Sequence, residues 1–112
     1  MKKKILIAGI YGQDGSYLAQ YLIKKKNYQI IGLTRKIRKN FKYFAGDEKK
    51  IKIIQTNYHY SSLSKIVKKI KPFIIFNLTG QSVPVISWSI PDKTIFSIVN
   101  ININFIKTIL NF

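Results

Sequence analysis

Short, continuous apolar runs alternate along this chain with longer segments whose apolar positions recur every three or four residues. The runs cover residues 4–8, 28–33, 51–55 and 73–78, and each is rich in Ile, Leu or Phe. Apolar runs of this length are typical of strands that are buried on both faces of a parallel sheet. The pattern therefore predicts four strands.

Helices are predicted between some of these strands. One is expected at 13–26, where four apolar positions recur at helical spacing and are predicted to face the sheet: Tyr17, Leu18, Tyr21 and Leu22. A second is expected at 61–71, with a hydroxyl of the Tyr60-Ser61-Ser62 stretch as its cap and Pro72 after its end. A last helix is expected from about Asp92 to the end of the chain.

Residues 35–50 are basic, aromatic and aperiodic, so this segment is predicted to be a long connection with a turn near Gly46-Asp47-Glu48. Alternation of strand and helix favours a parallel sheet covered by helices. The fold class is therefore α/β, an incomplete doubly wound parallel sheet of the Rossmann type with about four strands in the order 3-2-1-4. Five apolar residues of the last helix should leave a stripe exposed: Ile98, Ile101, Phe105, Ile109 and Phe112.

Three glycines follow the first predicted strand directly, at the start of the first predicted helix. The residues run from Gly9 through Gly12, Gln13 and Asp14 to Gly15. This is where a dinucleotide-binding motif belongs, because glycine permits a tight turn and the free amides of the helix start hold a pyrophosphate. A plain glycine turn between strand and helix is the alternative interpretation.

The residues after the second strand indicate which dinucleotide is bound. An acidic residue there would hold the ribose hydroxyls of NAD, but this chain has Thr34-Arg35-Lys36. Arg35 and Lys36 could pair with a 2′-phosphate, Arg35 through two hydrogen bonds, so NADP is predicted as the cofactor. The alternative is that these cations are solvated charges in a lysine-rich protein.

Two stretches carry a resemblance to a known family. Residues 8–18 read Ala-Gly-Ile-Tyr-Gly-Gln-Asp-Gly-Ser-Tyr-Leu, and residues 77–82 read Asn-Leu-Thr-Gly-Gln-Ser. They resemble the opening, and the segment after the fourth strand, of GDP-mannose 4,6-dehydratases, which are lyases of the extended short-chain dehydrogenase/reductase superfamily. The resemblance implies an NADP-dependent oxidation of the sugar at C4, loss of water and reduction at C6. Another nucleotide-sugar epimerase or reductase of that superfamily remains an alternative.

The resemblance also implies roles for single residues. Arg35 aligns with the family's 2′-phosphate arginine, Asn57 and Tyr58 are expected beside the adenine, and Leu78, Gln81 and Ser82 along the cofactor's ribose side. Residues 1–112 are expected to form the amino-terminal part of an NADP-binding domain, without a substrate domain. The family's catalytic residues are expected beyond residue 112, so no catalytic residue is assigned. In the full-length enzyme, GDP-mannose and further copies of the chain are the expected partners.

The net charge of +16 is compatible with a nucleic-acid partner, which is the rival hypothesis. Of the 20 basic residues only Arg35 and Arg38 are arginines, whereas sites that bind phosphate groups or recognise bases favour arginine. No nucleic-acid partner is therefore expected. No apolar stretch approaches the roughly 20 residues of a membrane span, so no membrane partner and a cytoplasmic location are expected.

Other candidate chemistry is weaker. The chain has no cysteine and one histidine, so no metal site is predicted. Tyr21 and Lys25 have the spacing of a catalytic Tyr-x-x-x-Lys pair, but Tyr21 is predicted to be core and Lys25 to face water. His59 is expected to be a loop or cap residue, and Asp47 and Glu48 to form a solvated turn.

Overall fold

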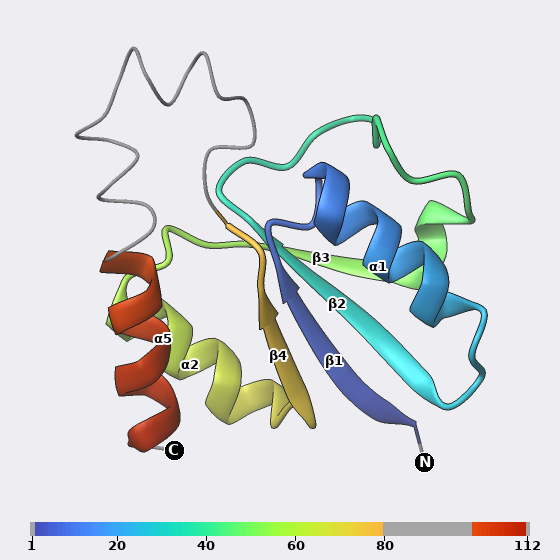
Figure 1. Cartoon of the computed structure of the whole chain (residues 1–112). Helices are drawn as coiled ribbons and strands as arrows, with labels where there is room; N and C mark the ends of the chain where they lie inside the picture. Colours follow the sequence, from blue (N-terminus) through green and yellow to red (C-terminus); the bar gives the residue numbers. More distant parts are fainter. Residues whose placement is uncertain (1, 80–99, 112) are drawn as a thin grey trace, which may run out of the picture.

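The computed structural model describes residues 2–79 and 100–111 and shows a four-stranded parallel sheet in the order β3-β2-β1-β4 (Figure 1). The strands are β1 (Lys3–Ala8), β2 (Tyr28–Thr34), β3 (Ile51–Gln55) and β4 (Ile74–Asn77). The helices are α1 (Gln13–Ile23), α2 (Tyr60–Ile70) and α5 (Ile101–Leu110), with a short 3₁₀ helix, η1 (Glu48–Lys50). The predicted fold class and strand order are confirmed.

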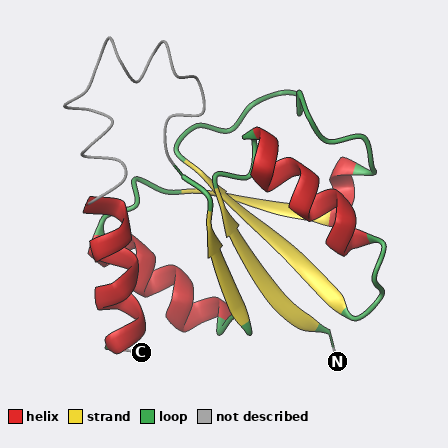
Figure 2. Cartoon of the chain, viewed as in Figure 1, coloured by secondary structure: helices red, strands yellow, loops and turns green. Residues whose placement is uncertain are grey.

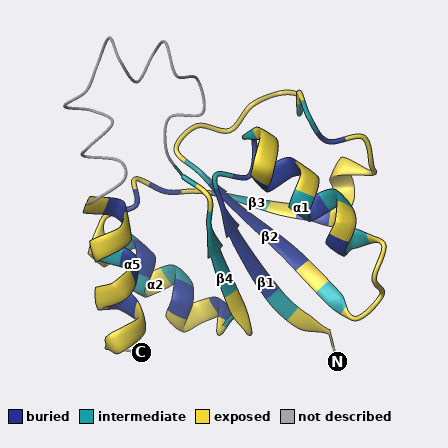
Figure 3. Ribbon diagram, viewed as in Figure 1, coloured by how far each residue is buried: buried dark blue, intermediate teal, exposed yellow. Residues whose placement is uncertain are grey.

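Helices cover both faces of the sheet, α1 on one and the packed pair α2 and α5 on the other (Figure 2). Alternate residues of β1 serve the two layers, since Ile5 and Ile7 pack with α1 while Leu6 and Ala8 pack with α2 and α5. The inner strands β1 and β2 are buried along most of their length (Figure 3). Their continuous apolar sequence follows from this two-sided burial.

The segment between β2 and β3 is a long connection, as predicted, which passes over α1 in Figure 1. It is held by an aromatic cluster in which the Phe41 ring is tilted against two neighbours, with ring centroids 4.6 Å from Tyr11 and 5.2 Å from Phe44. Near the expected turn, Asp47 accepts a hydrogen bond from the amide of Lys49 at 3.0 Å, and Glu48 accepts one from the amide of Phe41 at 2.9 Å. These carboxylates therefore shape the connection.

The face that α1 turns to the sheet differs from the prediction. Tyr17 and Tyr21 are 51% and 60% exposed, and the buried residues of the helix are Gly15, Ser16, Ala19 and Leu22. Small residues on the inner face let the helix backbone approach the sheet, and this leaves no room there for two tyrosine rings. The prediction that Tyr21 belongs to the core is wrong.

The start of α2 also differs in detail. His59 is its N-cap residue and no side chain caps the helix, so the predicted hydroxyl cap is not found. The placement of His59 as a cap residue is confirmed. The helix ends at Ile70, and its C-cap residue Lys71 adopts a left-handed conformation immediately before Pro72.

The last helix is confirmed at Ile101–Leu110, but two residues of the stripe that was predicted to be exposed are buried. Ile101, Phe105 and Thr108 are buried, whereas Ile109 is exposed as predicted. Ile98, Phe112 and the predicted helix start at Asp92 lie outside the described residues. The exposed apolar face instead consists of Ile103, Ile106, Ile109 and Leu110, and we call it the α5 apolar face.

The protein is expected to self-associate through the α5 apolar face, because burying an exposed apolar patch of this kind against a second copy removes it from water and lowers the free energy. Replacing Ile106 and Leu110 together by lysine should shift the sedimentation velocity profile towards that of a monomer. The measurement is made at about 0.15 M salt, where repulsion between charges more than about 8 Å apart is screened. The matched control is Ile37→Lys on the long connection, since Ile37 is 53% exposed and Ile106 is 56% exposed. A wild-type protein that stays monomeric at millimolar concentration contradicts this expectation.

Candidate functional site

The turn between β1 and α1 lies at the carboxyl end of the central strand. Gly9 has φ of +78°, and its amide donates to the carbonyl of Leu33 at 3.1 Å. The amide of Gly12 donates to the carbonyl of Gly9 at 3.1 Å, and the hydroxyl of Ser16 donates to the carbonyl of Ile10 at 2.8 Å. The turn is thus held by its own backbone, by the Leu33 carbonyl of β2 and by one buried serine.

The three glycines are required for different reasons. A Cβ on Gly9 would lie 2.6 Å from the carbonyl oxygen of Leu78, and one on Gly15 would lie 2.3 Å from that of Gly9. Gly12 has φ of −70°, a value that residues with a side chain also adopt. A Cβ on Gly12 would meet only the Gly9 oxygen, at an ordinary 3.4 Å. Gly9 and Gly15 therefore serve packing, and Gly12 keeps space open in front of the turn.

The first turn of α1 offers hydrogen-bond donors. Gly12 is its N-cap residue and no side chain caps it. The amides of Gln13, Asp14 and Gly15 have no acceptor inside the helix, because the first intrahelical bond runs from Ser16 to Gly12. Asp14 lies in this first turn, where a carboxylate is favoured by the helix dipole. The site can hold an anion of the size of a phosphate group.

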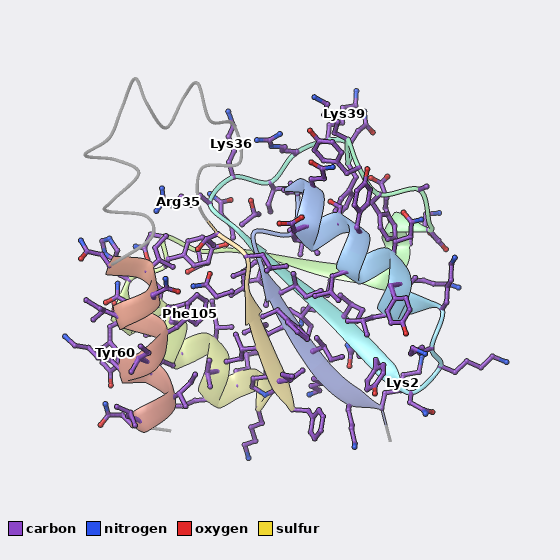
Figure 4. All side chains as sticks on the ribbon, viewed as in Figure 1. Lys2, Arg35, Lys36, Lys39, Tyr60 and Phe105 are labelled. Atoms are coloured by element: carbon purple, nitrogen blue, oxygen red, sulfur yellow. The ribbon has the colours of Figure 1, made fainter. Side chains whose placement is uncertain are left out.

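Arg35 and Lys36 follow β2 and project from the start of the long connection (Figure 4). The Thr34 hydroxyl shapes this start, because it donates to the carbonyl of Lys36 at 3.0 Å and accepts from the Lys36 amide at 3.3 Å. Arg35 also lines an open cavity of about 520 Å³, whose other lining residues are Gln55, Thr56, Asn57 and Ser62. The cavity is therefore bordered by polar groups and one cation.

The two residues expected beside an adenine have different environments. Asn57 lines the cavity, and its side chain accepts a hydrogen bond from the amide of His59 at 2.9 Å. Tyr58 is buried on the α2 and α5 side of the sheet, where its ring lies 6.1 Å from that of Phe105. Burial raises the pKa of Tyr58 to about 12, against the lowering effects of the Gly9 amide and of Arg35. The hydroxyl is therefore neutral at physiological pH.

Leu78 follows β4 beside the glycine turn. Its amide donates to the carbonyl of Ala8 at 3.1 Å, and its side chain is partly exposed. Asn77 orders the next residues, because its side-chain oxygen accepts from both the amide and the hydroxyl of Thr79. Gln81 and Ser82 lie outside the described residues.

Sequence reasoning missed two contacts that connect the parts of the site. The Tyr11 hydroxyl donates to the carbonyl of Arg38 at 3.2 Å and so ties the glycine turn to the long connection. The Tyr58 hydroxyl accepts from the Gly9 amide at 3.2 Å. The only signal in the sequence was the position of each tyrosine, one between two glycines and one just after the third strand.

The Tyr21 and Lys25 pair lies away from this site. The Lys25 ammonium group sits 4.9 Å from the centre of the exposed Tyr21 ring, at the far end of α1. Within residues 2–79 and 100–111, no three acidic or histidine side chains gather as a metal site requires. In the same part of the chain no helix has the length and apolar character needed to cross a membrane.

Comparison with solved structures finds the same fold in nucleotide-sugar enzymes and dehydrogenases. L-threonine dehydrogenase from Clostridium difficile superposes with a TM-score of 0.78 at 22% identity, over 96% of this chain and 33% of that one. UDP-glucose 4-epimerase from Thermotoga maritima gives 0.78 at 17% identity, over 94% and 33%. The Bordetella bronchiseptica enzyme WbmH, solved in complex with NAD⁺, gives 0.72 at 14% identity, over 96% and 35%.

Comparison of sequences identifies the family. The chain is 37% identical over 102 residues to GDP-mannose 4,6 dehydratase of Drosophila melanogaster, covering 82% of this chain and 26% of that protein. It is 38% identical over 105 residues to the Dictyostelium discoideum enzyme of the same name, covering 83% and 29%. The chain thus spans between a quarter and a third of the length of these relatives. Since the family model for GDP-mannose 4,6 dehydratase matches residues 6–111, the chain belongs to the GDP-mannose 4,6-dehydratase family.

Proposed function

We propose that residues 1–112 are the NADP-binding part of a GDP-mannose 4,6-dehydratase. The observation that carries the proposal is the arrangement of the glycine turn, the amides at the start of α1 and Arg35 at the carboxyl ends of adjacent parallel strands. In open α/β sheets a dinucleotide binds at this edge. The names of the relatives supply the substrate class.

The proposed binding mode assigns a part of the dinucleotide to each group. The pyrophosphate lies over Gly12 against the amides of Gln13, Asp14 and Gly15, where space and donors are both present. The adenosine end occupies the cavity beside Asn57 and Arg35. Leu78, Gln81 and Ser82 are proposed along the ribose side, by the resemblance of residues 77–82 to the family.

The choice of NADP over NAD rests on charge at the end of β2. The exposed Arg35 and Lys36 stand where an NAD enzyme has a carboxylate for the ribose hydroxyls. A 2′-phosphate brings about two negative charges to these cations, and the planar guanidinium of Arg35 can bind it through two parallel hydrogen bonds.

The bound dinucleotide supplies the hydride chemistry in the whole enzyme, and this part of the chain binds and orients it. GDP-mannose as substrate, homo-oligomeric assembly and a cytoplasmic location are proposed for the whole enzyme, on the strength of the family. The basic surface is proposed not to bind nucleic acid, because its cations are almost all lysines.

Titration of the protein with NADP and with NAD tests the proposal. NADP is expected to bind at least about tenfold more tightly, and Arg35→Ala should remove about 2 kcal/mol of binding free energy from NADP while leaving NAD almost unchanged. Arg38→Ala is the matched control, since Arg38 lies over the Tyr11 ring at 5.9 Å and is not assigned to the 2′-phosphate. Equal affinities for the two dinucleotides refute the role given to Arg35.

A further inference from the structure

Tyr58 has a backbone conformation that residues with a side chain rarely adopt. Its φ is +62°, and within residues 2–79 and 100–111 only Lys71 shares this feature among residues other than glycine. Lys71 ends a helix, where such a conformation is common. Tyr58 is buried between the sheet and α5, and a disfavoured backbone there persists only when its surroundings hold it.

Hydrogen bonds from three separate segments hold Tyr58. Its amide donates to the Thr56 hydroxyl at 3.1 Å, and its carbonyl accepts from the side-chain amide of Asn104 on α5 at 3.1 Å. Its hydroxyl accepts from the amide of Gly9 at 3.2 Å, across 49 residues of sequence, and shares that donor with the carbonyl of Leu33 at 3.1 Å. The side chain therefore reaches Gly9, the first glycine of the turn between β1 and α1.

The ring of Tyr58 contacts the other end of the proposed site. The guanidinium carbon of Arg35 lies 5.9 Å from the ring centre, within the range in which a cation is attracted to an aromatic face. One buried side chain thus touches both the turn proposed for the pyrophosphate and the arginine proposed for the 2′-phosphate. Because burial raises the pKa of Tyr58 to about 12, its hydroxyl keeps one protonation state, and the same role towards Gly9, throughout the physiological pH range.

We propose that Tyr58 is a positioning residue of the dinucleotide site. Its hydroxyl holds the Gly9 amide and its ring holds the Arg35 guanidinium, so that the turn and the cation are oriented before the ligand arrives. The inference rests on the proposed function, which assigns Arg35 and the turn to one ligand. Orienting both groups in advance lowers the ordering cost of binding.

Two variants separate the hydroxyl from the ring. Tyr58→Phe removes only the hydroxyl and is expected to weaken NADP and NAD equally, about fivefold each, through the turn. Tyr58→Leu also removes the ring, and it should weaken NADP about threefold more than NAD, because Arg35 loses its support. Tyr21→Phe is the matched control, since Tyr21 is exposed on α1, and it should change neither affinity.

Magnetic resonance of the free protein gives a readout that does not depend on a ligand. The Gly9 amide should shift and exchange its hydrogen faster in Tyr58→Phe, and the Arg35 side-chain Nε signal should lose its ring-current shift only in Tyr58→Leu. Thermal unfolding is recorded alongside. For Tyr58→Leu, a purely structural role lowers stability without changing the ratio of NADP to NAD affinity. For Tyr58→Phe, a purely structural role lowers stability without changing the Gly9 amide signal.

The results divide cleanly between the two proposals. If wild type binds neither dinucleotide, the proposed function fails, and the Gly9 and Arg35 signals alone then decide whether Tyr58 positions these groups. If wild type binds NADP and the Tyr58→Phe and Tyr58→Leu variants bind both dinucleotides as wild type does, the positioning role is overturned while the proposed function stands. Unchanged Gly9 and Arg35 signals in both variants overturn it equally.

Discussion

Replacing Gly12 by valine is expected to weaken dinucleotide binding at least about 100-fold while the protein remains folded. The backbone of Gly12 has φ of −70°, which valine tolerates, and a Cβ there meets only one atom, at 3.4 Å. The valine methyl groups would instead fill the space in front of the first-turn amides of α1, where the pyrophosphate is proposed to lie. Fluorescence titration with NADP measures the loss, and thermal unfolding should stay within a few degrees of wild type.

The control for Gly12→Val is Tyr21→Phe, which removes an exposed hydroxyl on the same helix and should leave binding intact. Normal binding by the valine variant shows that the ligand does not pass over Gly12. Loss of folding in the valine variant shows that the turn needs glycine there for its backbone and not for its ligand.

The sequence was sufficient for the sheet because its strands are short and apolar throughout. The run at 51–55 coincides with β3, and the other strands differ from their predicted bounds by at most one residue at each end. Burial on both faces makes such runs stand out from helical patterns. The order of the strands followed from the Rossmann-type assignment.

The orientation of helices was harder to predict, because two faces of one helix can both be apolar. On α5 the stripe of Ile101 and Phe105 is buried, and that of Ile103 and Ile106 is exposed. Hydrophobicity alone does not choose between these stripes. On α1 the tyrosines were counted as core, although the inner face is set by the close approach of Gly15 to the Gly9 backbone.

The geometry of the candidate site was predictable where it depends on local sequence and not where it depends on distant contacts. Three glycines before a helix identify the turn, and Arg35 is identified by its place after β2. Tyr58 could not be recognised as a link to Gly9, because that bond joins residues 49 positions apart and needs a positive φ at Tyr58. The long-range contacts of a buried polar group emerge only from the packed structure.

Gly15→Val is expected to lower the free energy of unfolding by about 3 kcal/mol or more, a large part of the 5–15 kcal/mol typical of a domain. A Cβ on Gly15 would lie 2.3 Å from the carbonyl oxygen and 3.0 Å from the carbonyl carbon of Gly9. Because both are backbone atoms of a turn fixed by Leu33 and Tyr58, the helix must move away from the sheet to make room. Urea unfolding followed by circular dichroism measures the change, and Gly12→Val is the control, since it adds the same side chain three residues earlier without the clash. A Gly15→Val protein as stable as Gly12→Val contradicts the close approach of α1 to the glycine turn.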